Sequence, residues 1–367
     1  MFNEFDKKYM NLALQLAKKG LYSTSPNPMV GCVIVKNDSV VGEGYHQKSG
    51  GPHAEVMALQ NAGKQAEGAE AYVTLEPCNH TGQTAPCTEA LLKAKVRRVV
   101  YATEDPNKGV VGGGGNRLKE NGVIVDSGCL KQEAKALNKS FFFLMATGKP
   151  WVTVKVGMSL DGFSAMASGE SKWITSTDSR KNVQKLRAKA SAILTGSGTI
   201  LADNPSLTVR DSDYDTKGRN PIIVIVDRRL RIDPAAKVLS HGEVILFTHF
   251  SNSKRVKRNV LTDLGCKVEY YKSLNRDGEI EELMKRLGKL GINNLLVEAG
   301  GNLTNSILET NLWNELVVYI APKILGVDAR PAFNRSSERF LSDVSTFKLV
   351  ESTTFNQDVK LTYENIK

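Results

Sequence analysis

The sequence lacks the segments that mark secreted and membrane-spanning proteins. Its first six residues contain no basic stretch followed by an apolar core, so we expect no secretory signal. No run approaches the roughly 20 apolar residues that a membrane helix needs. Only five cysteines occur, and they show no pattern typical of a disulfide framework. These absences predict a cytoplasmic protein with no membrane partner.

Clustered positive charge is also missing. Lys and Arg total 49 against 39 Asp and Glu, which gives a formal net charge of +10. A basic protein can bind nucleic acid or handle small phosphorylated molecules. Here the basic residues are dispersed, and no block of five or six of them interleaves with aromatics. The pattern therefore argues against a nucleic-acid partner.

The length of the chain predicts two domains. It has 367 residues, whereas single cores rarely grow past about 250–300 residues. A short segment, residues 146–150, separates two halves that have similar alternating patterns. We therefore expect domains at residues 1–147 and 148–367, held close together because the linker is short.

The first half contains a pattern typical of a catalytic zinc site. His53 and Glu55 are followed by Cys78 and then by Cys87. Zinc deaminases hold Zn²⁺ with one His and two Cys, leave the fourth position to water, and use a Glu two residues after the His to transfer the proton. We predict that His53, Cys78 and Cys87 bind Zn²⁺ and that Glu55 carries the proton.

The spacing of the two cysteines separates the alternatives. Eight residues, 79–86, lie between them, whereas the usual signature has two. A nucleic-acid base deaminase with a C-terminal binding domain would have the two-residue gap and basic–aromatic interleaving. A binding protein with a structural zinc would need a fourth protein ligand and would have no use for Glu55. No fourth Cys or His lies at convincing spacing.

Apolar periodicity predicts an α/β fold in both halves. In the first half we expect helices at 5–17, from His53, from Cys87 and at 131–144, and strands at 30–35, 40–45, 71–75, 98–102 and 123–125. Together they predict a mixed sheet. Residues 112–115 are four glycines that we interpret as a flexible turn near the deaminase pocket.

In the second half we expect a parallel sheet with strands at 151–156, 192–195, 222–226, 244–247, 295–297 and 316–320, and helices at 178–189 and 279–290. Gly300 and Gly301 follow a strand and open a helix, which suits close backbone approach to an anion, although a glycine pair also occurs in ordinary turns.

Several motifs carry a resemblance to a known family. In the first half they are Ser25-Pro26-Asn27-Pro28, Gly51-Pro52-His53-Ala54-Glu55 and Glu76-Pro77-Cys78-Asn79-His80. In the second half they are Lys155-Val156-Gly157-Met158-Ser159-Leu160-Asp161-Gly162, Leu201-Ala202-Asp203-Asn204-Pro205 and Glu298-Ala299-Gly300-Gly301. On these motifs the chain resembles the bifunctional riboflavin-biosynthesis deaminase–reductases over nearly its whole length, including the eight-residue gap.

The resemblance implies a cytidine-deaminase-like N-terminal domain and a dihydrofolate-reductase-like C-terminal domain. It implies that the first domain removes the 2-amino group of 2,5-diamino-6-ribosylamino-4(3H)-pyrimidinone 5′-phosphate. The second would then use NADPH to reduce the ribosyl side chain, which gives 5-amino-6-ribitylamino-uracil 5′-phosphate. The partner would thus be a small phosphorylated pyrimidine, and we also expect a homo-oligomer.

The resemblance also implies roles for individual residues. In the deaminase half, those expected at the substrate are Asn27, His46, His80, Asp105 and Asn107. In the reductase half, those expected at the substrate are Ser171, Arg187, Leu207, Arg210 and Glu298. Those expected at the cofactor are Gly157, Trp173, Thr199, Asp203 and the segment Gly300, Gly301, Asn302, Leu303, Thr304, Asn305 and Ser306. Lys155 is the candidate for assisting proton transfer, and Arg228 is the candidate for the NADPH 2′-phosphate, by analogy with strand-end arginines.

Overall fold

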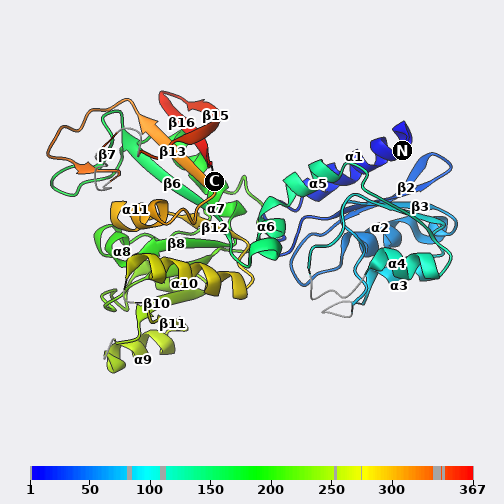
Figure 1. The fold of residues 1–367 in the computed structure, drawn as a ribbon, viewed down its shortest axis with the longest axis horizontal. Helices are drawn as coiled ribbons and strands as arrows, with labels where there is room; N and C mark the ends of the chain where they lie inside the picture. Colours follow the sequence, from blue (N-terminus) through cyan, green and yellow to red (C-terminus); the bar gives the residue numbers. More distant parts are fainter. Residues whose placement is uncertain are drawn as a thin grey trace. The chain divides into compact units, whose positions relative to one another are not determined.

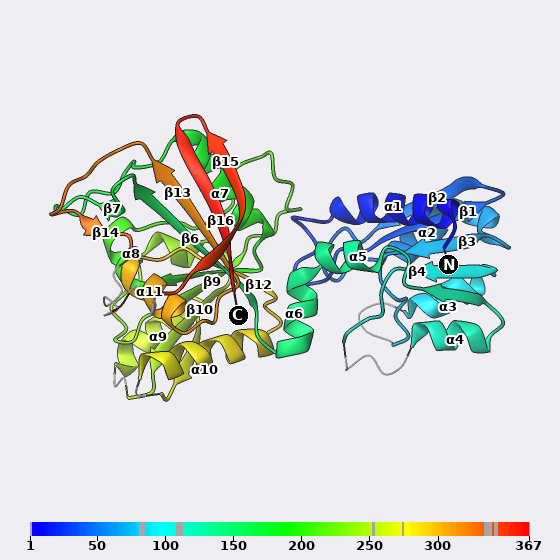
Figure 2. The same ribbon diagram turned by 45° about the horizontal axis from the view of Figure 1, so that its top comes forward.

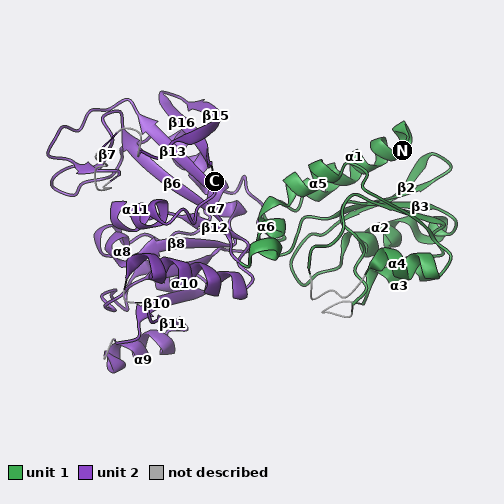
Figure 3. Ribbon diagram, in the orientation of Figure 1, with its two compact units in different colours: residues 1–148 green, residues 149–367 purple. Residues whose placement is uncertain are grey.

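The structure, a computed structural model, describes residues 2–80, 85–107, 113–251, 254–273, 275–333, 340 and 344–366. The chain forms two compact units, Met1–Gly148 and Lys149–Lys367 (Figure 3). Within the described part of the chain, no helix is both long enough and apolar enough to cross a membrane.

The first unit is built on a five-stranded sheet with the order β2-β1-β3-β4-β5 (Figure 1). Its strands are β1 (Gly31–Lys36), β2 (Ser39–Tyr45), β3 (Glu70–Val73), β4 (Arg98–Tyr101) and β5 (Ile124–Ser127). β1 runs antiparallel to β2 and β3, whereas β3, β4 and β5 are parallel. The expected mixed sheet is confirmed.

Helices cover both faces of this sheet because successive side chains along each strand point to opposite faces. Cys32 and Ile34 pack with α2 (Ala54–Ala62), α3 (Cys87–Lys93) and α4 (Gly114–Glu120), whereas Val33 and Val35 pack with α1 (Glu4–Lys18) and α5 (Lys131–Leu137). Figures 1 and 2 show α3 and α4 on the opposite side of the sheet from α1. A short 3₁₀ helix, Gly63–Ala66, follows α2.

The single helix expected at 131–144 is wrong. The structure has α5, which ends at Leu137, and α6 (Lys139–Thr147), and the chain breaks at Asn138. The Asn138 side chain accepts a hydrogen bond from Met29 N and donates one to Met29 O, both at 2.8 Å. This contact joins residues far apart in sequence, so local periodicity does not reveal it.

The glycine run also differs from the flexible turn that we expected. Gly113 has the left-handed φ of 69° and caps α4, and Gly114 and Gly115 are buried in its first turn. A Cβ at Gly114 would lie 1.8 Å from the carbonyl O of Pro77. Glycine is therefore required here for close packing. Gly112 and residues 81–84 of the polar insert lie outside the described residues.

The second unit is built on a nine-stranded sheet with the order β11-β10-β9-β8-β12-β6-β13-β16-β15. Its strands are β6 (Trp151–Ser159), β8 (Ala192–Gly196), β9 (Ile222–Val226), β10 (Val244–His249), β11 (Lys267–Tyr271), β12 (Asn294–Val297), β13 (Glu315–Ala321), β15 (Phe347–Phe355) and β16 (Asp358–Asn365). The pairs from β11 to β13 are parallel, as expected. β7 (Phe163–Ala165) and β14 (Arg330–Pro331) form a separate pair.

Helices again cover both faces. α10 (Arg276–Lys289) and α11 (Gly301–Glu309) pack on one face through a core that includes Leu283, Ile307 and Val154. On the other face lie α7 (Thr177–Lys189), α8 (Ser197–Asp203) and α9 (Arg255–Asp263), with Ile200 and Leu261 buried beside Ile225. A 3₁₀ helix at Lys237–Ser240 completes the unit.

An antiparallel hairpin, β15 and β16, was missed by the expectation of an all-parallel sheet. It lies beside β13 and is drawn in red in Figure 2. Asp358, at the start of β16, accepts hydrogen bonds from Ser176 N and Ser179 Oγ, both at 2.6 Å. The hairpin thereby fixes the N-terminus of α7.

Candidate active sites

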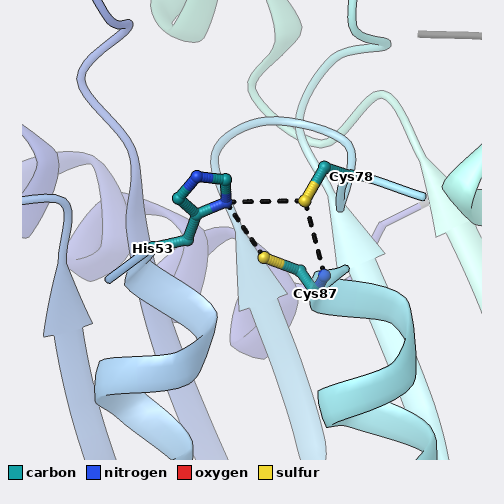
Figure 4. Close-up of side chains that lie close together, drawn as sticks. All are labelled: His53, Cys78 and Cys87. Atoms are coloured by element: carbon teal, nitrogen blue, oxygen red, sulfur yellow. Dashed lines mark hydrogen bonds between the residues drawn. The ribbon is translucent and has the colours of Figure 1, made fainter. Parts of the chain in front are cut away.

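Three side chains in the first unit converge as the zinc pattern predicts. His53 is the N-cap residue of α2, Cys87 is the first residue of α3, and Cys78 follows β3 (Figure 4). His53 Nδ1 lies 3.1 Å from Cys87 Sγ and 3.5 Å from Cys78 Sγ. All three donor atoms lie within 4.8 Å of one another. Both helix starts present backbone N–H groups, which favour anionic ligands.

This donor set fits a tetrahedral zinc. Ligand atoms bound at about 2.0–2.3 Å in a tetrahedron are roughly 3.4–3.8 Å apart, close to the distances found here. Hydrogen bonds from the Cys87 side chain and from His53, together with the Cys87 backbone N–H, lower the pKa of the Cys78 thiol. A lowered pKa favours the thiolate, which is the form that binds Zn²⁺. Three protein ligands leave one tetrahedral position for water.

Glu55 lies in the first turn of α2, two residues after His53, and only 3% of it is exposed. Burial raises the pKa of this carboxyl to about 7. A carboxyl with a pKa near neutrality can both accept and return a proton. Two strand glycines allow α2 to approach the sheet this closely. A Cβ at Gly44, for example, would lie 2.4 Å from Ala54 O.

Glu76 supports the metal site and was not among the predicted site residues. It accepts hydrogen bonds from Gly115 N at 3.0 Å and from Asp105 N at 3.3 Å. It thereby links the segment that carries Cys78 to the start of α4 and to the loop after β4. Its position beside Pro77 and Cys78 in the sequence was the available signal.

Asn27 and His46 form a pair beside the metal ligands. Asn27 Nδ2 lies 3.1 Å from His46 Nε2, and His46 Nδ1 lies 3.0 Å from Pro52 O. The His46 ring meets the His53 ring edge to face, with centroids 5.5 Å apart. Burial lowers the pKa of His46. Both ring nitrogens of His46 are thus engaged within the chain.

The other three residues expected at the deaminase substrate lie near Cys78. Asp105 Oδ1 accepts a hydrogen bond from Asn107 N at 2.9 Å. Burial raises the pKa of Asp105, while the nearby His80 opposes that shift and Cys78 adds to it. His80 itself is exposed. The structure therefore groups Asp105, Asn107 and His80 on the side of the metal site formed by the loops after β3 and β4.

A buried ion pair lies at the centre of the second unit. Arg187 of α7 binds both oxygens of Glu298, Nε to Oε1 at 2.6 Å and Nη2 to Oε2 at 2.9 Å. Only 12% and 9% of these side chains are exposed. Burial alone would raise the pKa of Glu298, but Arg187 and Lys155 outweigh it and lower the pKa. Lys155 on β6 is part-buried, and burial lowers the pKa of its amine.

Several residues expected at the cofactor lie where adjacent strands end. Gly157 is on β6, Thr199 is on α8 after β8, and Gly300 follows β12. Thr199 Oγ1 accepts a hydrogen bond from Gly300 N at 3.0 Å. A Cβ at Gly198 would have no neighbour within 4 Å, and one at Gly157 would contact only Thr175 and Lys155. These glycines border open space, as a bound dinucleotide requires.

Within the segment 300–306, the exposed part is its beginning. Asn302 is exposed and Gly301 part-exposed, whereas Leu303, Thr304, Asn305 and Ser306 are buried. The first-turn N–H groups of α11 can bind a diphosphate. The four buried side chains support the helix from inside, so the segment can reach a cofactor only through its backbone and Asn302.

The remaining reductase candidates are more scattered. Ser171 Oγ lies 3.4 Å from Asp203 Oδ1, and Trp173 is exposed under the Arg180 guanidinium. The Leu207 side chain is buried in the core, so only its backbone is available. Arg210 is exposed. Arg228 lies just beyond the carboxyl end of β9, and its Nη2 is 3.3 Å from Glu279 Oε1.

Sequence models of known families match both units. Residues 3–103 match the cytidine and deoxycytidylate deaminase zinc-binding region, and residues 150–361 match the RibD C-terminal domain. With the site geometry, these matches define the class: a zinc deaminase joined to a reductase.

Full-length relatives identify the family. The riboflavin biosynthesis protein RibD of Escherichia coli K12 is 46% identical, over 97% of this chain and 98% of that protein. The RibD of Buchnera aphidicola is 43% identical, over 96% of both. The structure of Acinetobacter baumannii RibD has a TM-score of 0.90 at 44% identity, covering 99% of both chains. A Thermotoga maritima diaminohydroxyphosphoribosylaminopyrimidine deaminase/5-amino-6-(5-phosphoribosylamino)uracil reductase has a TM-score of 0.83 at 33% identity, also covering 99% of both.

The chain therefore belongs to the RibD family of riboflavin biosynthesis proteins. It is a bifunctional enzyme with a zinc-dependent deaminase unit and an NADPH-dependent reductase unit, and it acts on small pyrimidines. The α/β fold, both cofactors and the function expected from the sequence are confirmed at this level.

Proposed function

We propose that the first unit removes the 2-amino group of 2,5-diamino-6-ribosylamino-4(3H)-pyrimidinone 5′-phosphate. The second unit then reduces the ribosyl side chain to ribityl and gives 5-amino-6-ribitylamino-uracil 5′-phosphate. The observation that carries this proposal is the convergence of His53, Cys78 and Cys87 within 4.8 Å beside the buried Glu55. The Thermotoga maritima relative, which is a deaminase and reductase with these two activities, supports it.

In the deaminase unit we assign proton transfer to Glu55. His53, Cys78 and Cys87 would hold the zinc ion, which would lower the pKa of a bound water toward about 7. Glu55 removes a proton from the attacking water and delivers it to the departing amine, which leaves as ammonia. Asn27, His80, Asp105 and Asn107 surround the pyrimidine and its phosphate arm. In this assignment Glu55 handles the protons, while these four residues orient the ring.

In the reductase unit we assign the centre of the pocket to Lys155, Arg187 and Glu298. NADPH supplies a hydride when bound, so the protein mainly aligns donor and acceptor. Lys155 is placed to orient the ribosyl oxygen and deliver a proton, because burial makes its amine a better proton donor. Glu298 is held rigidly by Arg187. Ser171, the backbone at Leu207, and Arg210 complete the substrate side, with the exposed Arg210 as the phosphate ligand.

For the cofactor we assign Gly157, Trp173, Thr199, Asp203 and the beginning of α11, Gly300 to Ser306. Arg228 is the proposed ligand of the NADPH 2′-phosphate. We assign the domains to residues 1–147 and 148–367, and we propose a homo-oligomer in the cytoplasm. Five cysteines that form no disulfide suit a reducing compartment.

One assay tests the two reactions separately. Purified protein is incubated with the diaminopyrimidinone phosphate, with and without NADPH, while ammonia release and NADPH absorbance are followed independently. Ammonia should appear without NADPH, and NADPH should be consumed only after deamination. Consumption of NADPH without ammonia release would contradict the proposed order.

A further inference from the structure

The hydrogen-bond geometry determines which atoms donate and which accept in the pair formed by Asn27 and His46. His46 Nδ1 lies 3.0 Å from Pro52 O. A carbonyl oxygen only accepts, so Nδ1 carries the hydrogen. Only 3% of His46 is exposed, and no carboxylate of the described residues hydrogen-bonds to its ring. The ring is therefore neutral, and its Nε2 is an acceptor.

The polarity of His46 fixes the orientation of the Asn27 amide. The Asn27 atom that lies 3.1 Å from the acceptor Nε2 is Nδ2, which donates. The opposite orientation would place two acceptors face to face. Asn27 Oδ1 is then directed away from His46, and it makes no hydrogen bond with a described side chain or backbone group. It remains available as an acceptor, and the His46 ring that holds the amide lies edge to face with the ring of the ligand His53.

We propose that His46 is a positioning residue that acts through Asn27 and does not itself touch the substrate. It holds the Asn27 amide so that Oδ1 accepts a hydrogen bond from an N–H group of the pyrimidine. The chain Pro52 O, His46 and Asn27 thus selects rings that present a donor at this point and disfavours rings that present a carbonyl. This inference rests on the proposed deaminase substrate.

A double-mutant cycle on Asn27 and His46 tests the assignment. Asn27→Ala should raise the KM of ammonia release roughly 3- to 10-fold, the effect of one neutral hydrogen bond, and should change kcat less. His46→Asn keeps an amide where Nδ1 stood but loses the acceptor for Asn27, and should raise KM similarly. In the double variant, the second change should add nothing to the first. If the KM increases of the two single variants multiply in the double variant, His46 contacts the substrate itself and the proposal is overturned.

The conservative variant and two further measurements separate positioning from a structural role. His46→Gln keeps an acceptor where Nε2 stood, so its KM should lie closer to wild type than that of His46→Asn. Zinc content should be unchanged in all variants, and loss of zinc from His46→Asn overturns the assignment. In ¹⁵N NMR of the wild-type protein, His46 should show a protonated Nδ1 and an unprotonated Nε2. The opposite tautomer would reverse the Asn27 amide and refute the polarity.

The double-mutant cycle can also be measured by binding alone, without any reaction. Its result is then independent of whether the proposed reaction takes place. In a Glu55→Gln background, the same variants are titrated with the diaminopyrimidinone phosphate and their Kd values are compared. Binding with the expected coupling, combined with absence of ammonia release from the wild type, would contradict the proposed reaction and retain the role of His46. Absence of binding to the Glu55→Gln protein would overturn both.

Discussion

Replacing Gly114 by alanine should weaken zinc binding, although Gly114 contacts no metal. An added Cβ would lie 1.8 Å from Pro77 O. Unbonded atoms rest about 3.5 Å apart, so the two backbones must separate by about 1.7 Å. Pro77 precedes the ligand Cys78, and zinc sites tolerate ligand errors of only about 0.2 Å. Replacing a residue that supports a metal ligand typically lowers metal affinity by roughly 10- to 100-fold. We expect the loss of zinc affinity in Gly114→Ala to be at least this large.

Metal analysis after dialysis against a graded series of chelator concentrations measures this effect. Ammonia release should fall in parallel, and overpacking should destabilise the first unit by about 1–3 kcal/mol. The matched control is Lys119→Ala, because Lys119 is exposed on the same helix. Reduction of supplied deaminated intermediate should stay normal in both variants. Zinc retention and unfolding temperature equal to wild type in Gly114→Ala would refute the reasoning.

Three further outcomes follow from the sites. Glu55→Gln should keep one zinc per chain and lose ammonia release by roughly 10²- to 10⁴-fold, and a normal rate would remove Glu55 from proton transfer. Arg210→Ala should raise the KM for the phosphorylated intermediate about 10-fold or more, because it deletes a charge-assisted contact, while NADPH affinity, measured by fluorescence titration, should hold. Burial alone would raise the pKa of Asp6, but hydrogen bonds from Arg98, Asn3 and Tyr72 outweigh it and lower the pKa. These hydrogen bonds therefore stabilise the folded protein fully above about pH 3.9, which is the pKa of an Asp side chain in the unfolded chain. This stabilisation is lost as the pH falls through the lower pKa that Asp6 has in the folded protein. In acid unfolding curves Asp6→Asn should remove this part of the pH dependence, and an unchanged curve would contradict it.

Local sequence signals predicted most of the elements and the metal ligands. His53 and Cys87 lie at the starts of helices and Cys78 follows a strand, and at such positions short motifs determine backbone geometry. The signals failed where a distant contact decides. The break at Asn138 depends on Met29, and the strand pair β15–β16 depends on pairing with β13. Such contacts do not alter the apolar periodicity of the segment whose structure they change, so the sequence of that segment does not reveal them.

The reductase pocket was the least predictable part for the same reason. Arg187 and Glu298 are 111 residues apart in sequence, and their bidentate pair exists only because α7 packs near the end of β12. The sequence suggested both as substrate residues but not that they bind each other. Nor did the motif around Gly300 reveal that the side chains of residues 303–306 are buried.

The contact between Asp358 and the first turn of α7 has a consequence for genetics. All the candidate site residues precede position 307, so a premature stop codon at about 350 would delete none of them. Such an allele would remove the acceptor for Ser176 N and Ser179 Oγ and would expose the edge of β13 that β16 covers. The first unit, with a core of its own, would remain. We therefore expect late nonsense alleles to separate the two activities, with ammonia release retained and reduction lost.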